Sequence, residues 1–177
     1  MRALVIQHME KEHGGTLAEF LRKQGWLIEE ARLHQGCRLN KTPGAYDPIV
    51  SMGGEMNVYE EDEYPFLAEE TEFLRDAVTN GSRVIGICLG AQMIAKALGA
   101  SVVSSPAKEV GWGAVNLTTA GVLDPLFDGC ENPLRVFQWH EDMFNIPESG
   151  ALLGYSDACP HQAFRFNRAY GLQFHVE

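Results

Sequence analysis

Hydrophobic and polar residues along the first hundred positions predict strands that alternate with helices. Short apolar runs, typical of buried strands, occupy 4–7, 26–31, 48–51 and 83–87. Apolar residues at helical spacing occupy 16–24, 66–80 and 89–98. Thr16 and Glu19 form a capping box that predicts the start of the first helix. This alternation indicates a parallel sheet with helices on both of its faces.

After residue 100 the pattern changes to short strands joined by turns. Five strand-like runs occupy 102–103, 112–117, 134–138, 163–166 and 172–174, and one short helix is expected at 124–127. We expect these runs to extend the parallel sheet with mixed or antiparallel strands. The chain contains no internal repeat and no linker, so residues 1–177 are expected to form a single domain.

Cys88 lies between the predicted strand 83–87 and the predicted helix 89–98, in the run Val-Ile-Gly-Ile-Cys-Leu-Gly-Ala-Gln. A Gly-x-nucleophile-x-Gly turn between strand and helix is a nucleophile elbow, in which the glycines leave room for a strained backbone. The N-terminus of the helix favours a thiolate over a thiol. We therefore predict that Cys88 is a nucleophile and not a buried structural cysteine.

The last apolar strand ends in the sequence His175-Val176-Glu177. Side chains alternate in direction along a strand, so the imidazole and the carboxylate point to the same side. The carboxylate can then fix the tautomer and orientation of a catalytic base. His140 is the alternative base, but His175 alone has a carboxylate two residues away.

These motifs, in the order Cys, His, Glu, resemble those of the class I glutamine amidotransferases, whose elbow reads G-x-C-x-G-x-Q and whose closing motif reads H-P-E. Segments 51–56, 138–142 and 157–164 are more particularly similar to free-standing members related to the amidotransferase domain of GMP synthase. The resemblance covers residues 5–177. It implies an α/β fold with an open, mostly parallel, flavodoxin-like sheet, helices on both faces and an antiparallel extension.

The resemblance also implies roles for individual residues. The backbone N–H groups of Gly54 and Leu89 would form an oxyanion hole, and Gln92, His140 and Asp142 would bind glutamine. The implied reaction is hydrolysis of the glutamine side-chain amide to glutamate and ammonia, through a γ-glutamyl thioester on the catalytic cysteine. No metal and no organic cofactor are expected.

Three positions depart from the family pattern. Glu55 stands where the family usually has proline after Gly-Gly, and Val176 replaces the proline of the closing motif. In the family, the proline at each of these two positions stiffens a loop. Glu141 replaces the glycine of the usual H-G-D, close to where the family binds the amino-acid end of glutamine. Its carboxylate either turns outward into solvent or turns inward and alters substrate binding.

Composition narrows the range of partners. The 177-residue chain carries a formal net charge of −10, from 24 acidic and 14 basic residues, which argues against nucleic acid and anionic membrane surfaces. No apolar stretch approaches the ~20 residues of a membrane span, and the N-terminus is too short an apolar run for a signal peptide. Four cysteines and no signal sequence predict a reducing cytoplasm. The cysteines form no C-x-x-C pair, which argues against structural zinc.

The chain has no glycine-rich phosphate loop, so the expected partner is a synthetase or other acceptor subunit that receives the ammonia. One alternative is a γ-glutamyl hydrolase or peptidase with the same triad. Another is a catalytically silent binding or regulatory module, which would not need all three triad residues. The family normally continues beyond Glu177, which predicts a truncated C-terminal end.

Two groups of polar residues are expected to have no catalytic role. The carboxylates of the acidic run 60–63 and of Glu69, Glu70 and Glu72 are predicted to be solvated at the N-terminus of a helix, where they favour the helix dipole. The remaining histidines, including His8, are expected to be structural or exposed.

Overall fold

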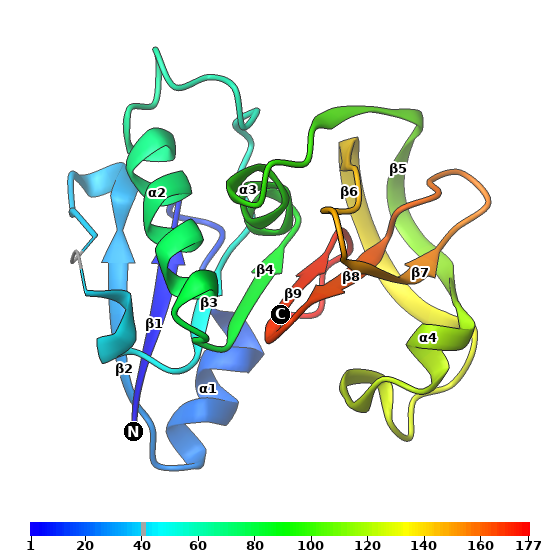
Figure 1. The fold of residues 1–177 in the computed structure, drawn as a ribbon, viewed down its shortest axis with the longest axis horizontal. Coiled ribbons are helices and arrows are strands. Elements are labelled where there is room, and N and C mark those ends of the chain that lie inside the picture. Colours follow the sequence, from blue (N-terminus) through cyan, green and yellow to red (C-terminus); the bar gives the residue numbers. More distant parts are fainter. Residues whose placement is uncertain (40–41) are drawn as a thin grey trace.

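Parallel strands form one half of the central sheet. The computed structural model describes residues 1–39 and 42–177, and within these ranges nine strands form one sheet in the order β2-β1-β3-β4-β9-β8-β7-β5-β6 (Figure 1). The parallel strands are β1 (Arg2–Gln7), β2 (Leu27–Arg32), β3 (Ile49–Ser51), β4 (Val84–Ile87) and β9 (Ala169–Leu172). The predicted parallel sheet is confirmed.

The antiparallel extension is also confirmed. Its strands are β8 (Ala163–Phe166), β7 (Ala151–Tyr155), β5 (Val102–Leu117) and β6 (Leu134–Phe144). Strands β5 and β6 form a long antiparallel hairpin, with α4 (Thr119–Val122) and η3 (Pro125–Phe127) in the connection between them, and its register shifts between Ser104 and Glu109. Figure 1 shows this hairpin curling away from the parallel strands at the right of the molecule.

Helices cover both faces of the parallel strands. The longer helices are α1 (Gly15–Lys23), α2 (Phe66–Thr79) and α3 (Leu89–Ala97), and the short ones are η1 (Leu33–Gln35), η2 (Pro43–Ala45), α4 (Thr119–Val122) and η3 (Pro125–Phe127). Strand alternation explains the two layers. Leu4 of β1 shares a core with Leu74 of α2, whereas Val5 packs on the opposite face with Leu17 of α1.

Several element boundaries differ from the expected ones. Helix α1 starts at Gly15 with Gly14 at its N-cap and no side-chain cap, so the predicted capping box is wrong: Thr16 already lies inside the first turn. Strand β6 continues to Phe144, so His140 and Asp142 lie on a strand and not beyond it. Strand β5 runs through the polar segment 104–111, and β7 was not predicted.

Strand β9 joins the two halves of the sheet. It lies between β4, its parallel neighbour, and β8, its antiparallel neighbour. The backbone N–H of Cys88 donates to the carbonyl oxygen of Leu172, the last residue of β9, at 2.8 Å. Residues 173–177 therefore leave the sheet beside the end of β4.

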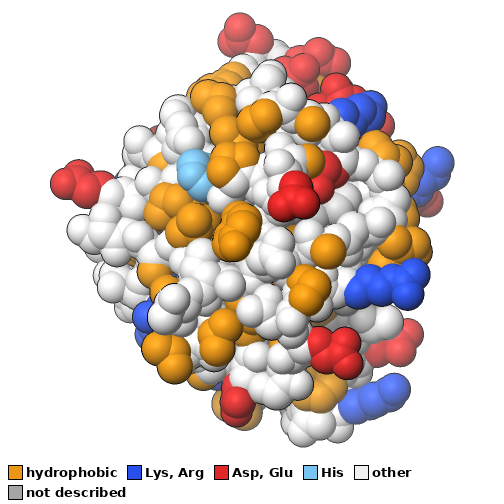
Figure 2. Space-filling view, turned by 90° about the vertical axis from the view of Figure 1, so that its right-hand side faces the viewer, with side chains coloured by type: hydrophobic (Ala, Val, Ile, Leu, Met, Phe, Trp, Pro, Cys, Tyr) orange, Lys and Arg blue, Asp and Glu red, His pale blue; other side chains and the backbone are white. Residues whose placement is uncertain are grey.

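The surface of the antiparallel half is mixed in character. Figure 2 shows hydrophobic side chains spread over a mostly uncharged face, with acidic and basic side chains interspersed. Among the helices of the described ranges, none is long and apolar enough to cross a bilayer.

Candidate functional site

Cys88 connects β4 to α3 in a strained turn. Its φ of 50° and ψ of −107° lie where side-chain-bearing residues are rare. A Cβ on Gly86 would lie 2.4 Å from the carbonyl oxygen of Gly90, and a Cβ on Gly90 would lie 2.1 Å from that of Ser51. The turn therefore requires glycine at both flanking positions, as the elbow pattern predicts.

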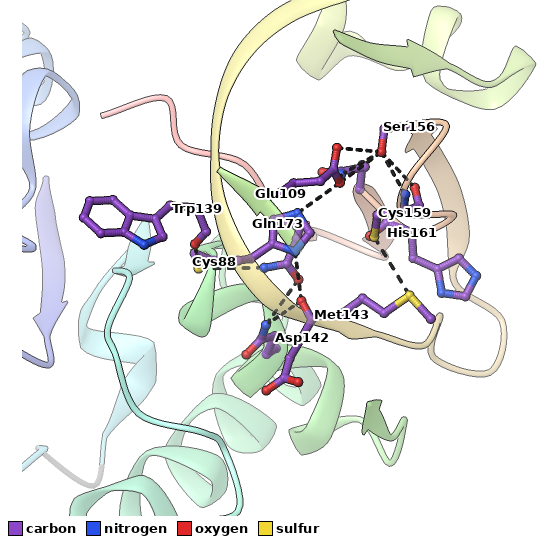
Figure 3. A network of polar contacts seen from close by, with 12 residues as sticks. Cys88, Glu109, Trp139, Asp142, Met143, Ser156, Cys159, His161 and Gln173 are labelled. Atoms are coloured by element: carbon purple, nitrogen blue, oxygen red, sulfur yellow. Dashed lines mark hydrogen bonds and ion pairs between the residues drawn. The ribbon is translucent and has the colours of Figure 1, made fainter. Parts of the chain in front are cut away.

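The thiol of Cys88 is nearly enclosed, with the residue 8% exposed. Its Sγ lies 3.7 Å from the carbonyl oxygen of Trp139, to which it donates (Figure 3). The side-chain amide of Gln173 donates to the sulfur, also at 3.7 Å. Strand β6 and the segment after β9 thus hold the sulfur from two sides.

His175 and Glu177 form the predicted pair. Nδ1 of His175 donates to Oε1 of Glu177 at 2.7 Å, and the N–H of Val176 donates to the other carboxylate oxygen at 2.9 Å. The backbone N–H of His175 donates to the carbonyl oxygen of Phe137 at 2.9 Å, and the ring of Phe137 lies edge-on to the imidazole. The imidazole is therefore fixed by both its backbone and its ring.

The electrostatics of His175 connect it to Cys88. Burial alone would lower the pKa of His175, but its contacts with Cys88 and Glu177 outweigh burial and raise the pKa to about 10. Burial would raise the pKa of Glu177, but the hydrogen bond and charge of His175 lower it. Within residues 1–39 and 42–177, Nε2 of His175 has no hydrogen-bond partner. The structure thus pairs His175 with Glu177, and the raised pKa of His175 reflects an electrostatic interaction with Cys88.

Gly54 and Leu89 lie next to each other, and the adjoining Gly53 lies near His175. A Cβ on Gly54 would lie 2.7 Å from Cδ2 of Leu89, and a Cβ on Gly53 would lie 3.4 Å from Cε1 of His175. Leu89 begins α3, where backbone N–H groups have no partner within the helix. The N–H of Gly90 donates to the carbonyl oxygen of Met52 at 3.1 Å and ties the glycine loop to the helix.

Gln92 reaches Cys88 through another residue. Its buried side-chain amide donates to Oε1 of Gln173 and to the carbonyl oxygen of Asp142, each at 3.3 Å. The carboxylate of Asp142 accepts from Nδ2 of Asn57 at 2.6 Å. Gln92 therefore links the backbone of Asp142 to Gln173, which contacts the sulfur, whereas the carboxylate of Asp142 is engaged by Asn57.

His140 of β6 takes part in a second set of polar contacts, which meets that of Gln92 at the carbonyl oxygen of Asp142. Its Nδ1 donates to the carbonyl oxygen of Asp142 at 3.1 Å, and its Nε2 lies 3.3 Å from Oε2 of Glu109. Glu109 also accepts from the hydroxyl of Ser156 (Figure 3) and from the side-chain amide of Gln162. Burial lowers the pKa of His140, although Glu109 opposes this effect. His140 thus has a carboxylate neighbour of its own, which sequence spacing did not reveal.

Sequence reasoning missed three residues at the site. Gln173 lies in the closing segment but was given no role, and Glu109 carried no local signal. Glu12 also carried no signal, yet a Cβ on Gly53 would lie 2.9 Å from its Oε2. All three depend on contacts between residues far apart in the sequence.

In the part of the chain that the structure describes, two groups of side chains could each offer three ligand atoms to a metal ion. Their donor atoms lie within 4.8 Å of one another in Glu12, His175 and Glu177, and in Glu109, His140 and Cys159. In the first group His175 donates to Glu177, and in the second Glu109 accepts from Ser156 and Gln162.

A cavity of about 650 Å³ opens beside His175, a volume typical of small-molecule sites. Its lining includes Lys11, Glu12, Trp112, Phe137, Trp139 and Glu177.

Glu141, the departure from the family pattern that is closest to the implied substrate, has a side chain that is 68% exposed and pairs with Lys108. Its carboxylate is therefore turned outward, the first of the two expected orientations.

Comparison with known sequences identifies relatives of this chain. The model of the family "Glutamine amidotransferase class-I" matches residues 21–177. The glutamine amidotransferase-like protein YfeJ of Salmonella typhimurium is 35% identical over 181 residues, which span all of this chain and 76% of YfeJ. The glutamine-hydrolyzing GMP synthase of Thermosipho melanesiensis is 28% identical over all of this chain, which spans 33% of that enzyme.

Solved structures give the same result. A glutamine amidotransferase from Thermotoga maritima superposes with a TM-score of 0.92 at 35% identity, covering 99% of this chain and 75% of the other. A glutamine amidotransferase from Methylobacillus flagellatus superposes with a TM-score of 0.90 at 29% identity, covering 98% and 69%. This chain belongs to the class I glutamine amidotransferase family.

Proposed function

We propose that this chain hydrolyses the side-chain amide of glutamine, with Cys88 as the nucleophile, His175 as the acid and base, and Glu177 as the group that orients the imidazole. The observation that carries the proposal is the contact network around His175. Cys88 and Glu177 together raise its pKa to about 10, so the imidazole is protonated beside the sulfur at neutral pH. Membership of the family supports the same reaction.

The first half of the reaction forms a thioester. The thiolate of Cys88 attacks the amide carbon, a sulfur–carbon bond forms, and the carbonyl electrons move to oxygen. The N–H groups of Gly54 and Leu89 donate to this oxyanion. When the carbon–nitrogen bond breaks, the imidazolium of His175 gives its proton to the departing nitrogen, and ammonia leaves. A γ-glutamyl group remains on the sulfur.

The second half regenerates the enzyme. His175, now neutral, takes a proton from water as the oxygen of that water attacks the thioester carbon. The sulfur–carbon bond breaks, the thiolate of Cys88 leaves, and glutamate is released. Glu177 stays ionised throughout, because the hydrogen bond from His175 lowers its pKa.

We assign substrate binding to the groups around the thiol. Gln92 acts together with Gln173, whose amide touches both Gln92 and the sulfur. The segment of β6 that contains His140 and Asp142 supplies the adjoining wall, since the carbonyl oxygen of Asp142 accepts from both Gln92 and His140.

Substitution of Cys88 tests this proposal directly. The purified chain should convert glutamine to glutamate and ammonia, and Cys88→Ala should lower kcat by about three orders of magnitude or more, as loss of a nucleophile does in comparable triads. Cys37→Ala and Cys130→Ala are matched controls, because both cysteines are free and exposed. These two variants should keep the activity of the unmodified chain.

Two further measurements test which substrate is preferred and which cysteine is the nucleophile. The ratio kcat/KM should be higher for free glutamine than for γ-glutamyl dipeptides, and the reverse order would favour a γ-glutamyl hydrolase. A glutamine-analogue electrophile should label Cys88 alone. Labelling of another cysteine, or turnover retained by Cys88→Ala, would contradict the assignment.

We also propose that the ammonia passes to a separate synthetase domain or subunit. The relatives support this, because this chain spans only a third of a GMP synthase named for glutamine hydrolysis. The rate of ammonia release by this chain alone gives the baseline for testing a candidate acceptor, whose addition should increase glutamine turnover.

A further inference from the structure

A buried ion pair lies beneath the Gly53–Gly54 loop, in contrast to the solvated position expected for Glu70. His8 follows β1 and Glu70 lies in α2, and both side chains are 0% exposed. Nε2 of His8 and Oε2 of Glu70 are 2.6 Å apart. A buried charge is costly unless it is paired and hydrogen-bonded, so this pair requires an explanation beyond helix capping.

The partners of His8 place a proton on Nδ1 and a carboxylate opposite Nε2. Nδ1 lies 3.0 Å from the carbonyl oxygen of Gly53, which can only accept, so Nδ1 must carry a proton. Nε2 faces the carboxylate of Glu70, whose other oxygen accepts from the hydroxyl of Ser51 at 2.7 Å. With Glu70 ionised, both ring nitrogens donate and His8 is an imidazolium. Burial lowers the pKa of His8, but Glu70 and the hydrogen bonds outweigh it and raise the pKa.

The hydrogen bond from His8 reaches the same peptide group that holds the proposed oxyanion donor. The carbonyl oxygen of Gly53 and the N–H of Gly54 belong to one peptide plane and point in opposite directions across it. With its oxygen held by His8, this peptide directs the N–H of Gly54 away from His8. A Cβ on Gly54 would lie 3.2 Å from Cβ of His8 and 2.7 Å from Cδ2 of Leu89, so Gly54 is packed between the histidine and the start of α3.

A cation on the oxygen of a peptide group also strengthens its N–H as a donor, because hydrogen bonds in series polarise one another. We propose that the His8–Glu70 ion pair is a positioning device that orients and polarises the Gly53–Gly54 peptide toward the oxyanion. The inference rests on the proposed function, since it assigns the ion pair a task in glutamine hydrolysis. His8 and Glu70 touch no reacting atom and act through Gly54.

Glu70→Gln tests this device while preserving the shape of the side chain. Loss of the carboxylate removes the charge that keeps His8 an imidazolium. Removal of one oxyanion donor typically costs 10²–10³ in kcat, so we expect this weakening to lower kcat about tenfold or more. KM should change less than about twofold, because the oxyanion exists only in the transition state.

Alkylation of Cys88 by iodoacetamide separates positioning from general damage. The sulfur displaces iodide from a saturated carbon, so no oxyanion develops, and the alkylation rate should stay at the value of the unmodified chain. Glu69→Gln is the matched control on the same helix: Glu69 accepts from the backbone N–H of Leu39 at 2.8 Å and pairs with Arg38, away from the site. Its kcat should be unchanged. Ser51→Ala, which removes only the hydroxyl that donates to Glu70, should lower kcat by less than Glu70→Gln.

A measurement without substrate distinguishes this inference from the proposed function. In ¹⁵N-labelled protein, the amide resonance of Gly54 should move upfield in Glu70→Gln and stay in place in Glu69→Gln. An unchanged resonance, an unchanged kcat, or equal losses of kcat and alkylation rate in Glu70→Gln would overturn the inference. If the unmodified chain fails to hydrolyse glutamine while the resonance still moves, the proposed function fails and the orienting contact stands.

Discussion

The backbone of Cys88 is held in a conformation that costs a non-glycine residue about 1–3 kcal/mol. The surrounding contacts maintain it: the N–H of Cys88 donates to Leu172, and its carbonyl oxygen accepts from the N–H of Gln92. The turn directs the sulfur toward Gln173, which follows β9 and donates to it from its side-chain amide. At the scale of the residue, the site therefore depends on a fixed backbone and on the charge of its neighbour His175.

The titration of His175 should report this charge. Its ring resonances in NMR spectra should shift with a midpoint near pH 10, the pKa raised by Cys88 and Glu177. Cys88→Ala and Glu177→Gln should each lower the midpoint, because each removes a group that raises the pKa. A midpoint unchanged by Cys88→Ala would mean that the thiol does not interact with this imidazole.

The same pKa predicts how stability depends on pH. The folded state binds the proton of His175 more tightly than the unfolded state, whose histidine has a pKa of 6.5. The stabilisation is complete below about pH 6.5 and is lost as pH rises through about 10. The free energy of unfolding in urea should fall across this window, and His175→Gln should remove that part of the slope.

At the scale of elements, the elbow depends on the absence of side chains at Gly86 and Gly90. Gly90→Ala should lower the free energy of unfolding by about 1–3 kcal/mol or more, because its Cβ would lie 2.1 Å from a backbone oxygen that cannot move aside. It should also change the rate at which iodoacetamide alkylates Cys88. Gly44→Ala is the control, since its Cβ would meet nothing within 4 Å. Unfolding curves for Gly90→Ala that match those of the control would contradict this account of the elbow.

The elements that could be predicted are those with a clear hydrophobic period and a glycine stop. Helix α2 ends at Thr79, just before Gly81 with its φ of 79°, as the sequence indicates. Strand β5 could not be predicted beyond its apolar ends, because its middle residues are exposed and polar and are held by pairing with β6. The start of α1 was missed because Gly14 and Gly15 make the entry without a side-chain cap.

The same distinction applies to the site. Cys88, His175 and Glu177 belong to short motifs, and residues close together in the sequence are enough to predict their candidate roles. Gln173 and the His8–Glu70 pair become visible only when distant segments meet, since His8 and Glu70 are 62 positions apart. The helical spacing places Glu70 on the same face as the buried Leu67 and Leu74. A carboxylate in the first turns of a helix is normally solvated, so the inward position of Glu70 was not predicted.

At the scale of the molecule, the candidate site is assembled from both halves of the sheet. Cys88 follows β4 in the parallel half, whereas β6 of the antiparallel half supplies the carbonyl oxygen that meets its sulfur. Strand β9 pairs with both halves and leads directly to His175. An intact site therefore requires the two halves to be folded and docked at the same time.

This arrangement predicts that the two halves unfold together. Helices α1, α2 and α3 all belong to the parallel half and dominate the far-ultraviolet circular dichroism. Cys159, which is 0% exposed, lies in the antiparallel half and can report its opening through thiol labelling in a variant with Cys37, Cys88 and Cys130 replaced by alanine.

In urea, the loss of helical signal and the labelling of Cys159 should share one midpoint, as expected for a single cooperative unit. A variant that keeps only the exposed Cys37 is the control, and it should be labelled fully before any helical signal is lost. Labelling of Cys159 at lower urea than the helical transition would mean that the antiparallel half opens by itself. In that case local opening of the antiparallel half would separate the carbonyl oxygen of Trp139 from the sulfur of Cys88. The proposed site would then be lost while α3 and the turn before it remain folded.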